Sequence, residues 1–333
     1  MKKQLRRWAI GLLLTFATLA GIINFPSQTS AQTPAELTLE VAGVTLEEIS
    51  EGVYGLIAST DFPPAEPATT AICNGGIVIG SDGVLVVDPF QNEDLANLLF
   101  TTVATLTDQP IRYVVNTHYH FDHSGGNAAA EALDFPLLGR GPIRDLMVEN
   151  NQEMDPNVTP PDVVVGAGSI WLGDREVQLA EFDGHTQGTD LVVYVPDVDV
   201  LMAGDLLFTQ RFPYVADGNI RVWQDNLDAL AAAYPTATIL PGHGPISDRT
   251  HLATLKGYLE TLETLALGWK AEGLSQEDAI AQTEIPDAYA DYLFQGLFLN
   301  ALEAAYQQIT LGNDDAAGIQ QYFQAQAPAL RAL

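Results

Sequence analysis

The stretch Thr117–Gly126, which reads THYHFDHSGG, is the most informative part of this chain. It contains His118, His120 and His123, half of the six histidines among 333 residues, together with Asp122. A hydrophobic core gains nothing from such a loop, because buried polar groups cost free energy unless they are bonded. Imidazole and carboxylate groups are, however, the ligands that zinc, iron and manganese take in proteins. The stretch therefore predicts a metal site.

Four more polar residues occur in a shared context, because each follows an apolar run and has glycine or proline as a neighbour. They are Asp88, His185, Asp205 and His243. This context predicts side chains at the ends of strands, on turns, where protein scaffolds usually carry their functional groups. We therefore expect these side chains to converge with the histidine stretch on one edge of the fold.

The spacing within the stretch suggests two ions. In an extended loop, residues two apart project to the same side, so His118 and His120 can bind one ion together. Asp122 and His123 follow the bend and can face another ion beside the first. Three protein ligands for each ion leave a position for water, which is typical of a catalytic zinc site. Because bound zinc lowers the pKa of water from about 16 to about 7, hydroxide forms there at neutral pH.

Apolar patterning predicts an α/β fold. In the first half we expect strands at 53–60, 75–80, 83–90 and 111–118, with helices over 94–106, 125–133 and 142–151. In the second half we expect strands at 163–165, 177–182, 190–196, 199–205 and 237–244, with a helix over 223–233. From residue 249 the pattern is helical, with breaks at Gly273 and Pro286. This order is typical of two sheets whose outer faces are covered by helices.

The N-terminal 31 residues have the layout of a secretory signal peptide. Four basic residues stand among the first seven, an apolar run covers Trp8–Ile23, and small residues precede a predicted cut after Ala31. The alternative is a membrane anchor, but the run is shorter than the roughly 20 residues that span a bilayer. We therefore expect an exported protein, periplasmic or secreted, without a stable membrane anchor after cleavage. The pair Arg6–Arg7 leaves the export route, general or twin-arginine, open.

The charge balance restricts the partners of the chain. It has 14 Lys and Arg against 43 Asp and Glu, which gives a formal net charge of −29. Such a surface repels nucleic acid and anionic membranes, so we expect a small-molecule substrate instead. Cys73 is the only cysteine and is expected to be a small buried residue. The sequence does not determine an oligomeric state.

The pattern H-x-H-x-D-H, followed by three separate ligand positions, resembles the metallo-β-lactamase superfamily in the style of its glyoxalase-II-like dinuclear zinc hydrolases. The resemblance covers about Val44–Asp248. It implies an αββα sandwich, which agrees with the strand and helix pattern. We therefore divide the chain into a signal peptide (1–31), a metallo-β-lactamase-like domain (32–248) and a helical C-terminal extension packed on it (249–333).

The resemblance also implies a role for each ligand. His118, His120 and His185 look like the ligands of one metal ion. Asp122, His123 and His243 look like the ligands of the other ion, and Asp205 looks like a bridge between both. The implied cofactors are two Zn²⁺ ions, with iron or manganese as alternatives. In the implied reaction, a hydroxide shared by the two ions attacks a carbonyl carbon, and Asp122 orients it.

One departure from the family concerns the substrate. Many zinc β-lactamases have a cysteine where this chain has Asp205, and shortly after it a lysine that holds the carboxylate of the drug. Here the third residue after Asp205 is Phe208, and the nearest basic residue is Arg211. We therefore expect cleavage of an amide, lactone, ester or thioester before β-lactamase activity proper. Candidate substrate contacts are Phe62, Arg211 and Tyr214.

Other interpretations stay open at this point. The same ligands hold iron in related oxidoreductases, and a periplasmic accessory protein would use the metals only for folding. Asp88 either orients a metal-binding histidine through a hydrogen bond or is an ordinary turn residue at the end of a strand. The C-terminal helices either form a wall of the site or simply pack on the sandwich.

Overall fold

The computed structural model describes residues 37–313, apart from residues 153 and 156. The predicted signal peptide, and residues 314–333 of the predicted helical extension, lie outside the described residues. From Leu37 onwards, the described chain belongs to one compact unit. None of the helices in the described part is long and apolar enough to cross a membrane.

Seven strands form the first sheet, in the order in which they occur along the chain. They are β1 Val44–Ser50, β2 Val53–Ala58, β3 Gly75–Gly80, β4 Gly83–Val87, β5 Ile111–Val115, β6 Leu137–Arg140 and β7 Val163–Val165. Neighbours pair antiparallel from β1 to β4 and parallel from β4 to β7. Since β4 and β5 are parallel with Val87 opposite Val115, the residues that follow each strand leave from the same edge.

Five strands form the second sheet in the order β12-β11-β10-β9-β8. They are β8 Gly168–Leu172, β9 Arg175–Glu181, β10 Leu191–Val195, β11 Val200–Phe208 and β12 Thr238–His243. Neighbours pair antiparallel from β8 to β11, while β11 and β12 are parallel. Every residue of β11, which lies between β10 and β12, is buried.

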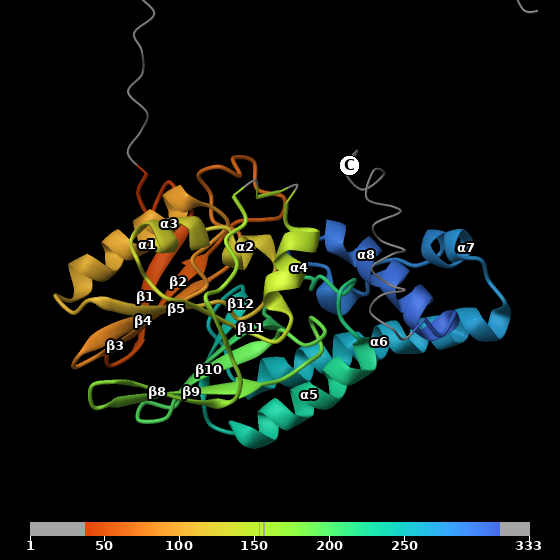
Figure 1. The fold of residues 1–333 in the computed structure, drawn as a ribbon. Helices are drawn as coiled ribbons and strands as arrows, with labels where there is room; N and C mark the ends of the chain where they lie inside the picture. The colour runs from red at the N-terminus through yellow and green to blue at the C-terminus, as the bar shows by residue number, and fades with distance from the viewer. Residues whose placement is uncertain (1–36, 153, 156, 314–333) are drawn as a thin grey trace, which may run out of the picture. The chain divides into compact units, whose positions relative to one another are not determined.

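The two sheets pack face to face, and helices cover their outer faces. Val78 and Leu85 of the first sheet share one apolar cluster with Val193 and Leu240 of the second. The first sheet is covered by α1 Glu93–Leu106 and α3 Asn127–Ala132, and the second by α5 Ile220–Ala233 and α6 Arg249–Glu272 (Figure 1). This arrangement confirms the predicted αββα sandwich.

The remaining helices are short. They are α2 Phe121–Ser124, α4 Ile143–Asn150, α7 Gln276–Ala281, a 3₁₀ turn Asp287–Tyr289, α8 Gly296–Ala305 and a π-helical turn Tyr306–Thr310. In the region after residue 248, Asp248 accepts a hydrogen bond from the N–H of Thr250 at 2.8 Å and begins α6. The helix ends at Gly273, whose φ of 68° is the left-handed conformation that favours glycine at such ends. The helix α6 packs beside α5 and against β11 of the second sheet, and α8 packs on α6. The domain boundary at Asp248 stays a prediction.

Several elements differ from the predictions in instructive ways. The strands β1, β6 and β8 were not predicted, since β1 and β8 are largely exposed and β6 has only four residues. Of the expected helix over 125–133, the structure has only α3, and a separate short helix, α2, precedes it at Phe121–Ser124. The helix expected from Trp223 begins at Ile220, because the side chain of Asn219 accepts hydrogen bonds from two N–H groups of its first turn.

Candidate metal centre

The residues that were singled out in the sequence meet where strands of both sheets end. Asp88 follows β4, and the histidine stretch follows β5. His185 lies between β9 and β10, and His243 is the last residue of β12. Asp205 was expected on a turn but lies inside β11, just after Gly204, where the register between β11 and β12 shifts. Both sheets therefore contribute side chains to one site.

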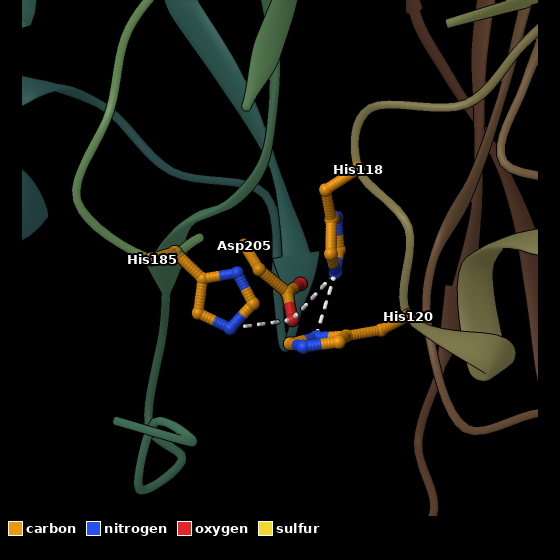
Figure 2. Close-up of side chains that lie close together, drawn as sticks. All are labelled: His118, His120, His185 and Asp205. Carbon is orange, nitrogen blue, oxygen red and sulfur yellow. Dashed lines mark hydrogen bonds and ion pairs between the residues drawn. The ribbon is translucent and has the colours of Figure 1, made fainter. Parts of the chain in front are cut away.

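The first set of side chains that can hold a metal ion is His118, His120, His185 and Asp205. In Figure 2 the three imidazoles surround the carboxylate of Asp205. Its Oδ2 lies 3.6 Å from His118 Nε2 and 3.5 Å from His185 Nε2. The Nδ1 of His120 lies 3.0 Å from His118 Nε2. Three ring nitrogens and one carboxylate oxygen thus point to a common centre.

The second set consists of Asp122, His123 and His243. Asp122 Oδ2 lies 3.5 Å from His123 Nε2 and 3.3 Å from His243 Nε2. The other oxygen of Asp205, Oδ1, lies 3.1 Å and 3.3 Å from the same two nitrogens. One carboxylate therefore offers one oxygen to each set, as the family resemblance implied for this residue.

Local packing explains the shape of the histidine stretch. The short helix α2 turns Asp122 and His123 away from the extended part, and Ser124 Oγ donates to the carbonyl of His120 at 2.8 Å. Gly125 and Gly126 both have ordinary right-handed backbones. A Cβ atom on Gly126 would lie 2.0 Å from the carbonyl oxygen of Pro89, so close approach of two backbones requires the glycine.

Asp88 fixes the proton positions of one histidine in each set. Its Oδ2 accepts hydrogen bonds from His123 Nδ1 at 2.8 Å and from Thr117 Oγ1 at 2.7 Å. Because the Thr117 hydroxyl gives its proton to Asp88, it accepts one from His118 Nδ1, 3.0 Å away. In their neutral forms, His118 and His123 then both direct the lone pair of Nε2 towards the site. Asp88 is buried, and its Oδ1 accepts from the N–H of Thr117 at 2.8 Å.

Two more histidines are oriented by partners outside the sets. His243 Nδ1 donates to the carbonyl of Ile72 at 3.1 Å, which leaves Nε2 for a metal. His120 Nε2 lies 3.0 Å from Asp217 Oδ2, an oxygen that also accepts from the hydroxyl of Tyr119. Sequence reasoning missed this role, because Asp217 followed by Gly218 is typical of an ordinary turn.

His185 is the exception, and it tests whether a cation fits. Both its ring nitrogens are buried without a hydrogen-bond partner among the described residues, and so is Asp205 Oδ1. Asp190 lies nearby, but it accepts from the N–H groups of His185 and Thr186 instead, at 3.1 Å and 2.8 Å. Burial raises the pKa of Asp190 to about 7. One nitrogen of a neutral imidazole is an acceptor, and a buried acceptor nitrogen beside a buried carboxylate is an environment that a bound cation satisfies.

The electrostatics of the two sets differ. Burial lowers the pKa of His118 well below its usual value and that of His185 to about 3. Burial also acts to lower the pKa of His123 and His243, but the surrounding carboxylates, Asp205 foremost, outweigh it. The pKa of His243 is raised to about 9, and that of His123 is raised well above its usual value. In the metal-free chain at neutral pH, protons therefore compete with a cation mainly in the second set.

The chemistry of the donor atoms also limits which metal ions suit the site. It offers imidazole nitrogens and carboxylate oxygens, and no thiolate belongs to either set. Cys73 is buried, its pKa is raised to about 12 by burial, and its thiol donates to the carbonyl of Asp122 at 3.0 Å. It therefore supports the loop as a small neutral residue. Such a donor set suits zinc, and also iron or manganese.

The three candidate substrate contacts lie in different surroundings. Tyr214 is half-buried with its ring centroid 5.5 Å from that of His120. Arg211 is only 7% exposed, and its Cζ lies 5.7 Å from the ring centroid of Phe294. Phe62 is half-buried with its ring centroid 5.7 Å from that of the same phenylalanine. Of the three, only Tyr214 packs directly against a residue of the two metal-binding sets.

Comparisons with known proteins concern the family and the fold of this chain. A sequence profile of the metallo-beta-lactamase superfamily matches residues 68–243, more than half of the chain. A metallo-beta-lactamase type 2 of Pseudomonas aeruginosa is 22% identical over 66% of this chain and 87% of its own length. A hydroxyacylglutathione hydrolase of Thermosynechococcus vestitus is 30% identical over 44% of this chain and 52% of its own length.

The similarity extends to solved structures. The metallo-beta-lactamase FIM-1 of Pseudomonas aeruginosa, solved in a mono-zinc form, superposes with a TM-score of 0.56 at 22% identity. The match covers 66% of this chain and 95% of that structure. At this level of identity the likeness concerns the fold.

Proposed function

We propose a hydrolytic function for this chain, which belongs to the metallo-β-lactamase superfamily. In this proposal the two sets of side chains bind two zinc ions and cleave a carbonyl-type bond, an amide, lactone, ester or thioester, in a small molecule. The proposal rests chiefly on one observation, the convergence, from both sheets, of seven side chains that can hold metal ions. The position of Asp205 between the sets supports a pair of ions rather than one.

In the proposed reaction, the bound ions, Asp122 and Tyr214 have different roles. When bound, the ions would supply Lewis-acid chemistry, which lowers the pKa of water and polarises a carbonyl group. Asp122 is held by its contacts with His123 and His243, and its carboxylate orients the attacking water and accepts the proton that the water loses. Burial, and then the charge of Asp217, raise the pKa of Tyr214 well above 10. Its hydroxyl therefore stays protonated and donates a hydrogen bond to a substrate oxygen.

The surroundings favour a substrate without a carboxylate close to the scissile bond. At the position where many zinc β-lactamases carry lysine, Phe208 stacks on His243 with ring centroids 4.8 Å apart. The guanidinium of Arg211 faces Phe294 and is largely buried. Neither position offers a cation to an anionic group. β-Lactamase activity is the second candidate, and the relatives that carry that name favour it.

A panel of substrates on zinc-loaded protein tests the proposal. We expect turnover of at least one lactone, ester, thioester, amide or cephalosporin. Asp122→Asn should lower the rate by about 10²–10⁴-fold at saturating zinc, because an amide cannot accept the proton. Asp225→Asn, an exposed position on α5, is the matched control and should leave the rate unchanged.

Other results would point to the alternatives. Purified protein that contains iron and shows the corresponding absorption would indicate an iron-dependent oxidoreductase. Full occupancy by zinc without turnover of any substrate would indicate an accessory protein that uses the metal for folding. Equal rates for Asp122→Asn and the parent would contradict the assigned role of Asp122.

We also propose that the chain is exported and that residues 1–31 are removed. The support is the order of basic, apolar and small residues at the N-terminus. Mass spectrometry of the protein from the producing cell would identify the mature N-terminus. A soluble cytoplasmic protein that still begins at Met1 would contradict this proposal.

A further inference from the structure

A buried phenylalanine from the C-terminal region lies beside the second metal-binding set. Phe294 precedes α8, is 2% exposed, and has a φ of 63°. Side chains other than glycine rarely adopt this left-handed backbone, so contacts around the residue must hold it there. The contacts that do so come from two distant parts of the chain.

The first support is backbone pairing with the loop that follows β11. The N–H of Leu293 donates to the carbonyl of Gln210 at 3.1 Å, and the N–H of Phe212 donates to the carbonyl of Leu293 at 3.0 Å. Arg211, between these two residues, forms a parallel bridge with Leu293. The segment 292–295 is therefore fixed along the loop that leaves Asp205 and Phe208.

The second support is a hydrogen-bond latch from the Pro-rich loop between β2 and β3. Asp61 Oδ1 accepts from the N–H of Phe62 at 2.8 Å and from the N–H of Phe294 at 2.7 Å. Asp61 and Phe294 are 233 positions apart in the sequence. One carboxylate oxygen thus joins the loop to the C-terminal region, and the rings of Phe62 and Phe294 pack with centroids 5.7 Å apart.

The ring that is held in this way contacts a proposed metal ligand. Phe294 meets His243 at a ring-centroid distance of 5.3 Å and an interplanar angle of 74°, which is edge to face. Phe208 stacks on the same imidazole at 4.8 Å and 14°. With Nδ1 bonded to Ile72, the imidazole is confined by two aromatic rings and one hydrogen bond. Such outer contacts determine how accurately a ligand is presented to its metal.

We infer that Phe294 is a positioning residue for His243, and that the segment 292–295, latched by Asp61, is a functional part of the metal centre. The inference rests on the metal-binding part of the proposed function. Asp61 and Phe294 both lie outside residues 68–243, which match the superfamily profile. The contact therefore involves residues outside the part of the chain that matches the profile.

Metal affinity measured on the full-length chain tests the inference without any substrate. Zinc would be titrated against a competing chelator, with the parent, Phe294→Ala and Phe298→Ala compared after circular dichroism has established folding. Phe298 is the matched control, because it is buried in the same region and packs on Phe212. We expect Phe294→Ala to weaken one of two binding steps by about 10–100-fold, the usual effect of losing an outer contact of a ligand. Phe298→Ala should leave both steps within about threefold of the parent.

A further pair of variants keeps the test decisive if Phe294→Ala does not fold. Asp61→Ala removes the latch at an exposed side chain and should weaken the same step, whereas Asp61→Asn keeps an oxygen acceptor and should behave like the parent. Equal zinc affinities for Phe294→Ala and the parent, or equal losses for Asp61→Ala and Asp61→Asn, would overturn the inference. A parent chain that binds no metal would instead defeat the proposed function itself.

Discussion

Asp88→Asn is the substitution for which the structure gives the sharpest expectation. The carboxylate of Asp88 accepts three hydrogen bonds, from Thr117 N–H, Thr117 Oγ1 and His123 Nδ1, at 2.7–2.8 Å. An amide has the same shape, but one of its two ends is a donor. Whichever end faces His123, one buried donor then meets another donor. Asparagine also tolerates the left-handed backbone of position 88, where φ is 53°.

The size of the effect follows from the network. If the amide nitrogen faces His123, that imidazole must carry its proton on Nε2, the atom 3.1 Å from Asp205 Oδ1. The Thr117 hydroxyl then donates its proton to His118 Nδ1, so the imidazole of His118 must also carry its own proton on Nε2. Both sets lose a lone pair, so we expect zinc affinity to fall about 10–100-fold, which is roughly 1.4–2.7 kcal/mol. The opposite orientation leaves the N–H of Thr117 unbonded and costs about 1–3 kcal/mol of folding stability.

Chelator competition and thermal unfolding, measured on the same samples, would check this expectation. Asp134→Asn is the matched control, because Asp134 is also left-handed, with a φ of 57°, but is exposed. It should leave zinc affinity unchanged. An Asp88→Asn protein with parental zinc affinity and a parental melting temperature would refute the hydrogen-bond argument.

Three further predictions concern protons, packing and substrate. Zinc uptake at pH 7 should release protons, because the pKa of His123 is raised and that of His243 is raised to about 9. For the same reason the metal-free fold should lose stability as the pH rises from about 6.5 towards 9. Calorimetry in buffers of different ionisation enthalpy would detect the release, and its absence at pH 7 would contradict the assignment. Trp223→Phe should lower the free energy of unfolding by about 2–3 kcal/mol, because it leaves a void and removes the hydrogen bond from Trp223 Nε1 to the carbonyl of Leu206 at 3.1 Å. Denaturant unfolding would measure this loss, and a value below about 0.5 kcal/mol would contradict the prediction. Phe62→Ala should raise KM for substrates with an apolar group while kcat is retained, and an unchanged KM would remove Phe62 from the candidate substrate contacts.

The fold and the residues that gather in the two candidate metal-binding sets could be predicted because their signals are local in sequence. Apolar runs with a period of two or 3.6 residues mark most of the strands and helices. The polar residue that follows such a run, beside glycine or proline, marks the site at His185 and His243. Asp205 lies within a strand, yet it shows the same pattern, because it follows an apolar run and Gly204 precedes it.

The supporting contacts could not be predicted, because they depend on where distant loops meet. Asp217 bonds to His120 across 97 positions, and nothing beside it in the sequence distinguishes it from other acidic turn residues. Phe294 reaches His243 only because its backbone pairs with the loop after β11 and bonds to Asp61. The same holds for Asp88, whose hydrogen bonds follow from the parallel alignment of β4 and β5.

The division of the ligands between two sheets has a consequence for the mechanics of the chain. His123 follows the first sheet and His243 ends a strand of the second, and they are 120 positions apart in sequence. An ion that both residues bind would act as a cross-link that closes this long loop, in a chain whose single cysteine excludes an internal disulfide. In the chain-entropy picture, a covalent link across a loop of this size is worth about 4–5 kcal/mol. Loss of the metal would then make separation of the two sheets easier, and separation would expose the apolar layer between them to proteolysis and aggregation.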